Sequence, residues 1–565
     1  MNNNNNQTTL LHRFLHWEHN TADAIYLTQP LPDGSVQEYS WREVGDQARR
    51  MAAHLRSLDL PAKSSIGLFG KNTAHWIIAD LAIWMAGHVS VPLYTTANAD
   101  TVRYVLEHAE VRLLFVGRLE GEAAGWQAIC ASIPDSLALI DLPMSSCGKG
   151  TSWEHIIATT EPLQTVHLPA AEELATIIYT SGSTGDPKGV MHSFRAMYNA
   201  PAVTGCMYAN GEGTRSSDRL LSYLPLAHTA ERAVVEAVSL FSGCQVFFSL
   251  GLDTFSEDLR RARPTIFLSM PRLWGKFYQG INERIDPATQ AAVFANPVEG
   301  PLMKAQILSA LGLDRVHTGL SGSAPLPVKV MEWYRQLGLE LLEGYGMSEN
   351  FGTSHFSLPG QVRVGYVGAV IPGVECRIGA DNEILVKSPA QMLGYYKLPE
   401  LTAQSYTEDG LFRTGDRGEL DEQGRLRITG RVKELFKTAK GKYVAPVPIE
   451  AKLGNHPRVE ASCVTGVGLA QPLALLNVSA DTRAALASAE GRDKVVTELE
   501  VFLAEVNSQF EAHEQLACLV VVNEPWSIAN ALLTPTLKIR RSQIEERYHN
   551  QIEGWGGSRG KVVFE

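Results

Sequence analysis

Short runs of hydrophobic residues alternate with longer segments in which hydrophobic positions recur every three or four residues. Runs such as 65–69 and 176–179 are almost continuously apolar, as expected for strands buried on both faces of a parallel sheet. Segments such as 74–86 fit helices that connect such strands. The alternation predicts βαβ units and parallel sheets. The other strands expected from this pattern are 89–94, 112–116, 220–224, 245–250 and 265–269, and further helices are expected at 230–241 and 328–337.

The pattern changes after about residue 375. Short apolar runs are then separated by polar turns such as Asp409-Gly410, which is typical of a small β-rich unit. From about Arg431, a charged segment leads into mixed helix and strand, with a helix expected near 493–510 and a strand at 516–522. These changes predict a domain boundary near residue 431.

The length of 565 residues exceeds what one hydrophobic core usually organises, so we expect more than one domain. We predict an α/β fold whose large N-terminal domain, residues 1–430, holds two βαβ-type subdomains and a small β-rich subdomain at about 375–430. Residues 431–565 are expected to form a small α+β C-terminal domain.

Composition and charge exclude several classes of protein. The formal net charge of −11 offers no basic excess for binding a phosphate backbone, so no nucleic-acid partner is expected. No stretch approaches the roughly 18 apolar residues that cross a bilayer. The seven cysteines are too scattered for a metal site and too few for a disulfide framework.

The N-terminus carries a run of Asn rather than a secretory signal, so we expect a cytoplasmic protein. The segment 10–17 has two interpretations. It is either a helix docked on its own domain, or an amphipathic helix that makes peripheral contact with the inner face of a membrane.

A loop rich in Gly, Ser and Thr follows the predicted strand 176–179. Glycines let backbone N–H groups approach an anion, hydroxyl groups donate to phosphate oxygens, and a lysine adds positive charge. The loop is not a Walker A motif, because Pro187 and Gly189 stand where that motif needs Gly and Ser or Thr. It therefore predicts a nucleoside triphosphate site of another kind. The candidate phosphate ligands are Thr180, Ser181, Gly182, Ser183, Thr184, Gly185 and Lys188.

A second candidate segment, 343–349, directly follows the apolar run 339–342. It therefore lies at the carboxyl end of a predicted strand, where open α/β sheets bind ligands. Glu349 supplies a carboxylate there, and Mg²⁺ typically binds one or two carboxylates together with the phosphates of a substrate.

These segments and four others occur in an order that resembles the acyl-adenylate-forming superfamily, which includes acyl-CoA synthetases, luciferases and the adenylation domains of peptide synthetases. The resemblance covers about residues 20–545. The family more often has Thr where this chain has Ser348, and both residues carry a hydroxyl group. The four other segments are 322–325, 412–416, 430–446 and 534–541.

The resemblance implies a site for ATP and Mg²⁺. Thr184 and Glu349 would hold the metal, Tyr345 would lie against adenine, and Asp416 would accept hydrogen bonds from the ribose hydroxyls. The catalytic residues implied are Lys538, Lys188, Thr184 and Glu349. Further contacts to the nucleotide or the coenzyme would come from Ser323, Ala324, Gly346, Ser348, Arg431, Lys437 and Gly441.

The resemblance also implies that the C-terminal domain is mobile and turns about Lys433. Lys538 would orient the substrate carboxylate and stabilise charge in the adenylation transition state, as a cation aimed at developing charge does in a closed site. Gly441 would line the route by which the arm of coenzyme A enters.

The segments 224–228 and 271–274 resemble those of long-chain fatty acyl-CoA synthetases. His228 and Trp274 are therefore candidates for the acyl pocket, although a histidine satisfied within the core explains His228 equally well. Residues 275–312 are shorter than in long-chain enzymes, so the length of the acyl chain stays open.

The activity implied is ATP-dependent activation of a medium- to long-chain fatty acid to acyl-AMP and then acyl-CoA, with release of pyrophosphate and AMP. The expected partner is a small carboxylic acid, and a homodimer is one option for the assembly. Two alternatives stay open. The adenylate passes to an acyl carrier protein or closes to a β-lactone, or the fold serves as a non-catalytic nucleotide-binding scaffold.

Overall fold

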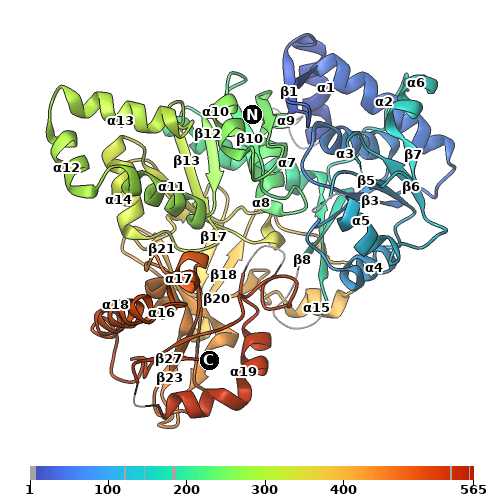
Figure 1. Cartoon of the computed structure of the whole chain (residues 1–565). Helices are drawn as coiled ribbons and strands as arrows, with labels where there is room; N and C mark the ends of the chain where they lie inside the picture. Colours follow the sequence, from blue (N-terminus) through green and yellow to red (C-terminus); the bar gives the residue numbers. More distant parts are fainter. Residues whose placement is uncertain (1–7, 120–122, 146, 181–185, 535–537, 559) are drawn as a thin grey trace. The chain divides into compact units, whose positions relative to one another are not determined.

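The structure is a computed structural model that describes every residue except 1–7, 120–122, 146, 181–185, 535–537 and 559. The chain forms two compact units, whose elements are labelled in Figure 1. Within the described part, the first unit contains residues up to Thr180, Asp186–Glu375 and Val386–Leu411. The second unit contains Cys376–Leu385 and Phe412–Glu565.

The first unit contains an eight-stranded sheet. Its inner strands are parallel, whereas β9 runs antiparallel to β8, and β19 antiparallel to β9. The strands, in their order across the sheet, are β19 (Gly394–Tyr395), β9 (Lys188–Ser193), β8 (Leu174–Thr180), β4 (Val89–Leu93), β3 (Ser65–Phe69), β5 (Leu113–Val116), β6 (Ala138–Asp141) and β7 (Thr151–Ser152).

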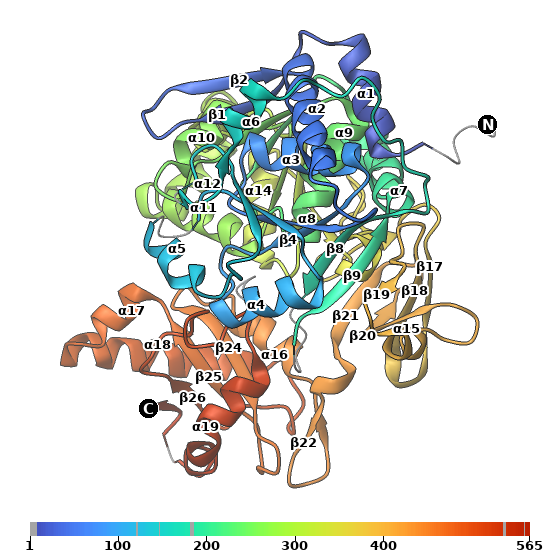
Figure 2. The ribbon, with the colours of Figure 1, turned by 90° about the vertical axis from the view of Figure 1, so that its right-hand side faces the viewer.

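Helices cover both faces of this sheet. Leu113 and Phe115 enter one hydrophobic cluster, whereas Leu114 and Val116 enter another, as the two-residue period of a strand requires. Figure 2 shows β4 and β8 between α3 on one side and α4 on the other. The helices of this region are α2 (Trp41–Ser57), α3 (Ala74–Ala86), α4 (Ala99–His108), α5 (Ala123–Cys130), α6 (Trp153–Thr159) and α7 (Phe194–Thr204).

Two further sheets complete the first unit. One has four strands, and in the other three parallel strands are followed by two antiparallel ones. The four-stranded sheet is β10 (Arg219–Ser222), β11 (Gln245–Phe248), β1 (Ile25–Pro30) and β2 (Val36–Ser40). The five-stranded sheet is β12 (Ile266–Ser269), β13 (Thr318–Gly322), β14 (Leu341–Tyr345), β15 (His355–Phe356) and β16 (Ala369–Val370).

The N-terminal helix α1 (Leu10–Asn20) is docked on its own unit. Leu10, Leu11 and Phe14 are completely buried. Trp17 donates its indole N–H to the carbonyl of Leu240 at 3.0 Å. The apolar face of this helix is therefore used within the protein, as in the first interpretation of segment 10–17. Within the described residues, no helix is both long and apolar enough to cross a membrane.

The helix expected at 230–241 is interrupted. It consists of α8 (Thr229–Glu231), the π-helical η4 (Arg232–Ala237) and α9 (Val238–Ser242). The completely buried guanidinium of Arg232 pairs with the carboxylates of Asp80 and Glu236. It also donates to the hydroxyl of Thr176 at 2.7 Å. The network ties the π-helix to α3 and to β8, the strand that leads into the phosphate loop.

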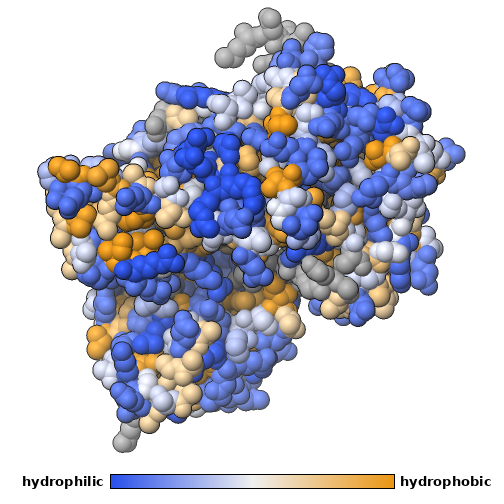
Figure 3. Space-filling model, turned by 45° about the horizontal axis from the view of Figure 1, so that its top comes forward, coloured by the Kyte–Doolittle hydropathy of each residue, from blue (hydrophilic) through white to orange (hydrophobic). Residues whose placement is uncertain are grey.

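The segment 275–312 falls in a group of helices at one edge of the first unit. Figure 3 shows hydrophobic residues gathered there, where α12 and α13 lie, on an otherwise mostly hydrophilic face. Val298 and Leu302 are 72% and 62% exposed. The helices of this group are α11 (Pro271–Arg284), α12 (Pro287–Ala295), α13 (Glu299–Ala310) and α14 (Val328–Leu337). The remaining helices of the first unit are α10 (Phe255–Ala262) and α15 (Pro399–Gln404).

The second unit contains a four-stranded β-sheet, a two-stranded hairpin and an α+β part. Two hydrophobic clusters cover the faces of the last sheet, with Val464 in one and Cys463 in the other. The β-rich part comprises β17 (Glu375–Ile378), β18 (Glu383–Lys387), β20 (Phe412–Leu420) and β21 (Leu426–Arg431), followed by η7 (Val432–Glu434), β22 (Phe436–Lys437) and β23 (Tyr443–Val444). The α+β part comprises α16 (Pro446–Leu453), β24 (Val459–Thr465), β25 (Leu473–Val478), α17 (Ala480–Ala485), α18 (Ala489–Asn507), β26 (Leu519–Val521), α19 (Arg541–Gly556) and β27 (Val562–Phe564).

The predicted α/β class, with a large N-terminal part and a small C-terminal α+β part, is confirmed. The strand predicted at 65–69 and the helices at 74–86 and 328–337 match β3, α3 and α14. The strand predicted at 220–224 ends at Ser222. It ends early because the N–H of Tyr223 donates to the buried carboxylate of Glu231 rather than to a neighbouring strand.

Candidate active site

The phosphate loop connects two antiparallel strands rather than a strand and a helix. Thr180, the last residue of β8, pairs with Lys188, the first residue of β9. The two ends of the loop are thereby fixed side by side at the carboxyl end of β8. Five of the predicted phosphate ligands lie outside the described residues: Ser181, Gly182, Ser183, Thr184 and Gly185.

Lys188 and Glu349 both contact one tyrosine, Tyr395. Tyr395 donates its phenol O–H to Glu349 Oε1 at 2.7 Å. The Lys188 ammonium lies 5.5 Å from the centroid of the same ring, in a cation–π arrangement. Burial, together with the Glu349 carboxylate, raises the pKa of Tyr395, so the phenol stays a hydrogen-bond donor at neutral pH. The contact brings two predicted catalytic residues together.

Glu349 fits the role of a ligand to Mg²⁺. One of its oxygens accepts the Tyr395 hydrogen bond, and no described residue donates a hydrogen bond to the other. The described residues contain no group of three His, Cys, Asp or Glu side chains that would hold a metal alone. A single carboxylate suits Mg²⁺, which takes its remaining ligands from water and substrate phosphates. The fit therefore requires a bound triphosphate.

The predicted adenine-side residues lie at the carboxyl ends of two adjacent parallel strands. Gly322 of β13 is paired with Gly344 of β14. Ser323 and Ala324 follow β13 and are exposed, and Ser323 has a φ of +68°. Tyr345 ends β14 and is mostly buried, with its ring 6.0 Å from that of His355. This edge of the sheet is where open α/β sheets bind ligands.

Gly346 lets the chain turn sharply after Tyr345. A Cβ at this position would overlap the carbonyl group of Gly352. The turn then continues into the short 3₁₀ helix η5 (Ser348–Asn350), which carries Ser348 and Glu349. Only glycine therefore allows the close backbone approach that positions both residues.

Glu343 bonds to the chain just after the adenine-side turn. It lies on β14, is 5% exposed, and accepts a hydrogen bond from the N–H of Leu326 at 3.2 Å. Burial raises its pKa to about 7, and the bond from Leu326 opposes that rise. The sequence placed Glu343 within a candidate segment without a role of its own, because its burial is visible only in the structure.

In the second unit, Asp416 and Arg431 are paired across two antiparallel strands. They are direct Cα partners of β20 and β21, and Arg431 Nε lies 3.2 Å from Asp416 Oδ1. Thr414 accepts a hydrogen bond from the N–H of Asp416 at 3.0 Å. Two residues predicted to contact ribose are therefore brought together.

Lys538 lies near this pair. Loss of water around its ammonium group lowers its pKa, the charge of Arg431 lowers it further, and Asp416 acts in the opposite direction. The residue as a whole is nevertheless exposed. Its backbone N–H donates to the hydroxyl of Thr534 at 3.0 Å. A cation in such surroundings is available to a negatively charged ligand.

Three further predicted residues lie on the exposed segment that follows β21. Lys433 belongs to η7 and is exposed. The Lys437 ammonium lies 4.8 Å from the ring centroid of Tyr443. Gly441 has a φ of +71°, and an added Cβ would meet no atom within 4 Å. Backbone conformation rather than space therefore favours glycine there, and its role in admitting coenzyme A stays a prediction.

The two candidates for the acyl pocket are both held by contacts within the first unit. His228 is the N-cap of α8, and its Nδ1 accepts the N–H of Ala230 at 3.1 Å. Trp274 is completely buried between Phe267 and Tyr334 and donates to the carbonyl of Leu320 at 3.2 Å. Both side chains have structural partners, so their contact with an acyl chain stays a prediction.

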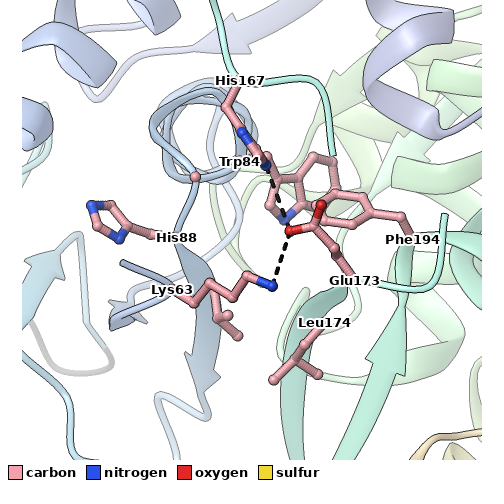
Figure 4. Close-up of a pocket in the computed structure, with 9 residues that line it drawn as sticks. Lys63, Trp84, His88, His167, Glu173, Leu174 and Phe194 are labelled. Atoms are coloured by element: carbon pink, nitrogen blue, oxygen red, sulfur yellow. Dashed lines mark ion pairs between the residues drawn. The ribbon is translucent and has the colours of Figure 1, made fainter. Parts of the chain in front are cut away.

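Two cavities in the first unit offer no alternative site. In the smaller, of about 10 Å³, Glu173 lies between Lys63 at 3.3 Å and His167 at 3.7 Å (Figure 4). That volume holds at most one water molecule. The larger, of about 250 Å³, is lined by α11, α12 and α14. Its amide Gln290 is already bonded to Trp333 and other groups.

Sequence reasoning missed Tyr395. It lies 46 residues after Glu349, and no motif spacing connects the two. The contact arises because β19 joins the sheet beside β9, where Tyr395 pairs with Val190. Such a contact can be predicted only when the order of the strands in the sheet is known.

Two family descriptions match the chain. The family described as AMP-binding enzyme matches residues 14–396. The family described as AMP-binding enzyme C-terminal domain matches residues 434–555. Together they account for most of both units.

Full-length relatives agree with these matches. The long-chain-fatty-acid–CoA ligase FadD15 of Mycobacterium bovis is 30% identical over 95% of this chain and 95% of its own. The peroxisomal long chain acyl-CoA synthetase 6 of Arabidopsis thaliana is 31% identical over 96% of this chain and 85% of its own.

A solved structure shares the fold. The A domain of carboxylic acid reductase from Segniliparus rugosus, in complex with AMP and a co-purified carboxylic acid, has a TM-score of 0.79 at 21% identity, covering 97% of this chain and 94% of that one. Family matches across both parts of the sequence, relatives that match over most of their length and the shared fold lead to one conclusion. The chain belongs to the AMP-binding enzyme family.

Proposed function

We propose that this protein activates a fatty acid of medium to long chain in two steps, forming an acyl-AMP and then an acyl-CoA. In the first step, a carboxylate oxygen of the acid attacks the α-phosphorus of ATP, and the bond to pyrophosphate breaks. In the second step, the thiol of coenzyme A loses its proton, its sulfur attacks the acyl carbonyl carbon, and AMP leaves.

One observation carries this proposal. Lys188, Tyr395 and Glu349 form a chain of contacts at the base of the phosphate loop. They do so in a protein that is 30% identical over 95% of its length to a long-chain-fatty-acid–CoA ligase. The presence of Lys538 and Glu349 argues against a non-catalytic scaffold.

Charge on the triphosphate would be stabilised by groups of the first unit. Lys188 supplies a positive charge beside the loop, and Thr184 and Glu349 would hold Mg²⁺. When bound, Mg²⁺ would neutralise phosphate charge and orient the leaving pyrophosphate. Tyr395 would keep the Glu349 carboxylate in one orientation, and Tyr345 with the Ser323-Ala324 turn would contact adenine.

The second unit would contribute the ribose contacts and the catalytic lysine. Asp416 would accept hydrogen bonds from the ribose hydroxyls, and Arg431 would orient Asp416. Lys538 would orient the substrate carboxylate and stabilise the charge that develops during adenylation.

The two steps would use different positions of a mobile C-terminal domain that begins at about residue 431. Rotation about Lys433 would withdraw Lys538 after adenylation and open the route for coenzyme A past Gly441, in a hinge motion that separates the half-reactions. Lys433→Pro tests this idea. It should impair thioester formation far more than adenylation, and equal losses in both would contradict the hinge.

The proposal also covers the location of the protein, its assembly and the length of its acyl substrate. We propose a cytoplasmic protein that acts as a monomer or a homodimer. Any peripheral contact with the inner face of a membrane would use a surface other than the apolar face of α1, which is buried in its own unit. The acyl chain length would be set by an apolar pocket that includes His228 and Trp274.

The test is a screen for acid-dependent release of AMP, with acids from acetate to oleate, each with and without coenzyme A. The proposal predicts release that peaks with medium- to long-chain acids and needs coenzyme A for turnover. Multiple turnovers without coenzyme A would indicate the β-lactone route, and turnover only after an acyl carrier protein is added would indicate the carrier route. No release with any acid, whether coenzyme A or a carrier protein is added, would leave only the scaffold.

A further inference from the structure

Arg541 is the buried centre of the C-terminal part of the second unit. It is the first residue of α19, and its side chain is 11% exposed. It donates to Glu450 Oε2 and to the carbonyl of Val464, both at 2.8 Å. Its Nε makes no hydrogen bond within the described residues and lies 3.6 Å from Glu434 Oε2. One guanidinium therefore joins α19, α16, β24 and η7.

One of these connections, from Arg541 to Glu434, links the segment that carries Lys538 to the segment that carries Lys433. Arg541 follows Lys538 by three residues, and Glu434 directly follows Lys433. The Arg431 charge acts on Lys538, so the two segments lie side by side at a second point as well. Arg431 repels Lys538, whereas Glu434 attracts Arg541. On each segment the two residues involved are three positions apart.

The residues just before and just after 535–537, including Lys538, are paired with one another in an antiparallel manner. Leu533 and Ile539 form an antiparallel bridge, and the N–H of Thr534 donates to the carbonyl of Lys538 at 2.7 Å. The N–H of Arg540 donates to the carbonyl of Leu532 at 2.9 Å. Since Ile539 and Arg540 lead directly into α19, a shift of Arg541 would also shift Lys538.

We propose that Arg541, through its ion pair with Glu434, is a positioning residue that holds Lys538 in register with the hinge segment, so that Lys538 reaches the ribose pair Asp416 and Arg431 during adenylation. This inference rests on the proposed function. Glu434 lies after the hinge residue, so the pair moves with the C-terminal domain and persists in both half-reactions. Only adenylation, however, uses Lys538, so only that step depends on the pair.

The test uses Glu434→Gln in the full chain, because Glu434 is partly exposed and its loss leaves the bonds from Arg541 to Glu450 and Val464 in place. Adenylation is measured as acid-dependent exchange of pyrophosphate into ATP. Thioester formation is measured separately, from synthetic acyl-AMP and coenzyme A. Exchange should fall about tenfold, since misplacing a catalytic group by about 1 Å costs up to about a hundredfold. Thioester formation should stay within about twofold.

Two further variants make the assignment specific. In a Lys538→Ala background, Glu434→Gln should cause no further loss of exchange, because its effect passes through that lysine. Glu545→Gln is the matched control. Glu545→Gln removes a carboxylate from α19, the helix that begins with Arg541. Glu545 accepts a hydrogen bond from Thr465 at 2.8 Å. Both half-reactions should be unchanged in this variant.

The proposal is overturned if Glu434→Gln slows both half-reactions equally, leaves exchange unchanged, or keeps its full effect without Lys538. Arg541→Lys is a second probe, because lysine keeps the positive charge but lacks the planar guanidinium that bonds several partners at once. It should also slow exchange more than thioester formation. Failure of the proposed function is a different result, in which the wild-type protein itself catalyses neither half-reaction with any acid.

Discussion

The phenol of Tyr395 donates a hydrogen bond of 2.7 Å to Glu349, while Lys188 lies against the face of the same ring. The three residues come from β19, η5 and β9, which are far apart in the sequence. A neutral phenol between a carboxylate and an ammonium group keeps both charges in fixed positions without joining them in an ion pair. Both charges are thus available to a ligand.

Tyr395→Phe should weaken adenylation without unfolding the protein. The substitution removes one hydrogen bond to a charged group, which is worth roughly 1.5–3 kcal/mol, so kcat/KM for ATP should fall about tenfold or more. The requirement for Mg²⁺ should shift to higher concentrations, because Glu349 loses its orientation. Steady-state kinetics over a range of Mg²⁺ concentrations measures both effects.

Tyr396→Phe is the matched control, since the Tyr396 ring contacts His108 and Lys397 instead. It should leave the Mg²⁺ dependence unchanged. An unaltered Mg²⁺ dependence in Tyr395→Phe would mean that the hydrogen bond has no part in metal binding.

Glu343→Gln should change how stability depends on pH. The carboxyl group has a pKa of about 7 in the folded protein against an ordinary value of 4.5, so the folded state binds its proton more tightly. Stability therefore falls as pH rises from about 4.5 to about 7. The variant lacks this loss and still accepts the bond from Leu326 through its amide oxygen.

Above pH 7, Glu343→Gln should be more stable than wild type by up to about 3 kcal/mol, because each pKa unit is worth about 1.4 kcal/mol. Near pH 4.5 the difference should be small. Thermal unfolding of both proteins across this pH range measures it. A constant difference at all pH values would show that folding does not raise the pKa of Glu343.

Asp416→Asn should reduce affinity for the ribose. A carboxylate accepts hydrogen bonds from two hydroxyls, and an amide accepts through only one oxygen. We expect KM for ATP to rise about tenfold and the preference for ATP over 2′-deoxy-ATP to shrink. Glu419→Gln, which alters an exposed carboxylate on the same strand paired with Arg427, should change neither. An unchanged preference in Asp416→Asn would remove the residue from the ribose site.

Gly346→Ala should destabilise the first unit. Its Cβ would overlap the carbonyl of Gly352, which is backbone and cannot turn away as a side chain can. The cost should be about 1–3 kcal/mol, as for other overpacked sites. Gly275→Ala, in a helix with open space around it, is the control and should not lower stability. Calorimetry of the two variants decides the matter, and equal melting temperatures would contradict the steric argument.

Much of this fold follows from hydrophobic periodicity. The strand 65–69 and the helix 74–86 match β3 and α3 because each is apolar enough to be buried on nearly every side. The segment 230–241 kept its helical character, but periodicity could not reveal the π-helix that places Arg232 against Asp80 and Glu236.

Some features of the candidate site could likewise be predicted from the sequence, and others could not. The positions of Tyr345 at the end of a strand and of Glu349 shortly after it could be predicted, because the apolar run 339–342 directly precedes them. Tyr395 and Arg541 could not, because their partners lie 46 and 107 residues away and are brought near by strand order and helix packing. The burial that raises the pKa of Glu343 likewise depends on tertiary packing rather than on its neighbours in sequence.

The central claim is that this protein forms an acyl-adenylate with the help of Lys538. The most direct measurement is the rate of acid-dependent pyrophosphate release from ATP by wild type and by Lys538→Ala, with a fatty acid and Mg²⁺ present. A cation that stabilises the transition state contributes several kcal/mol, so the account predicts a loss of about a hundredfold or more in the variant. Release at the wild-type rate by Lys538→Ala would contradict it.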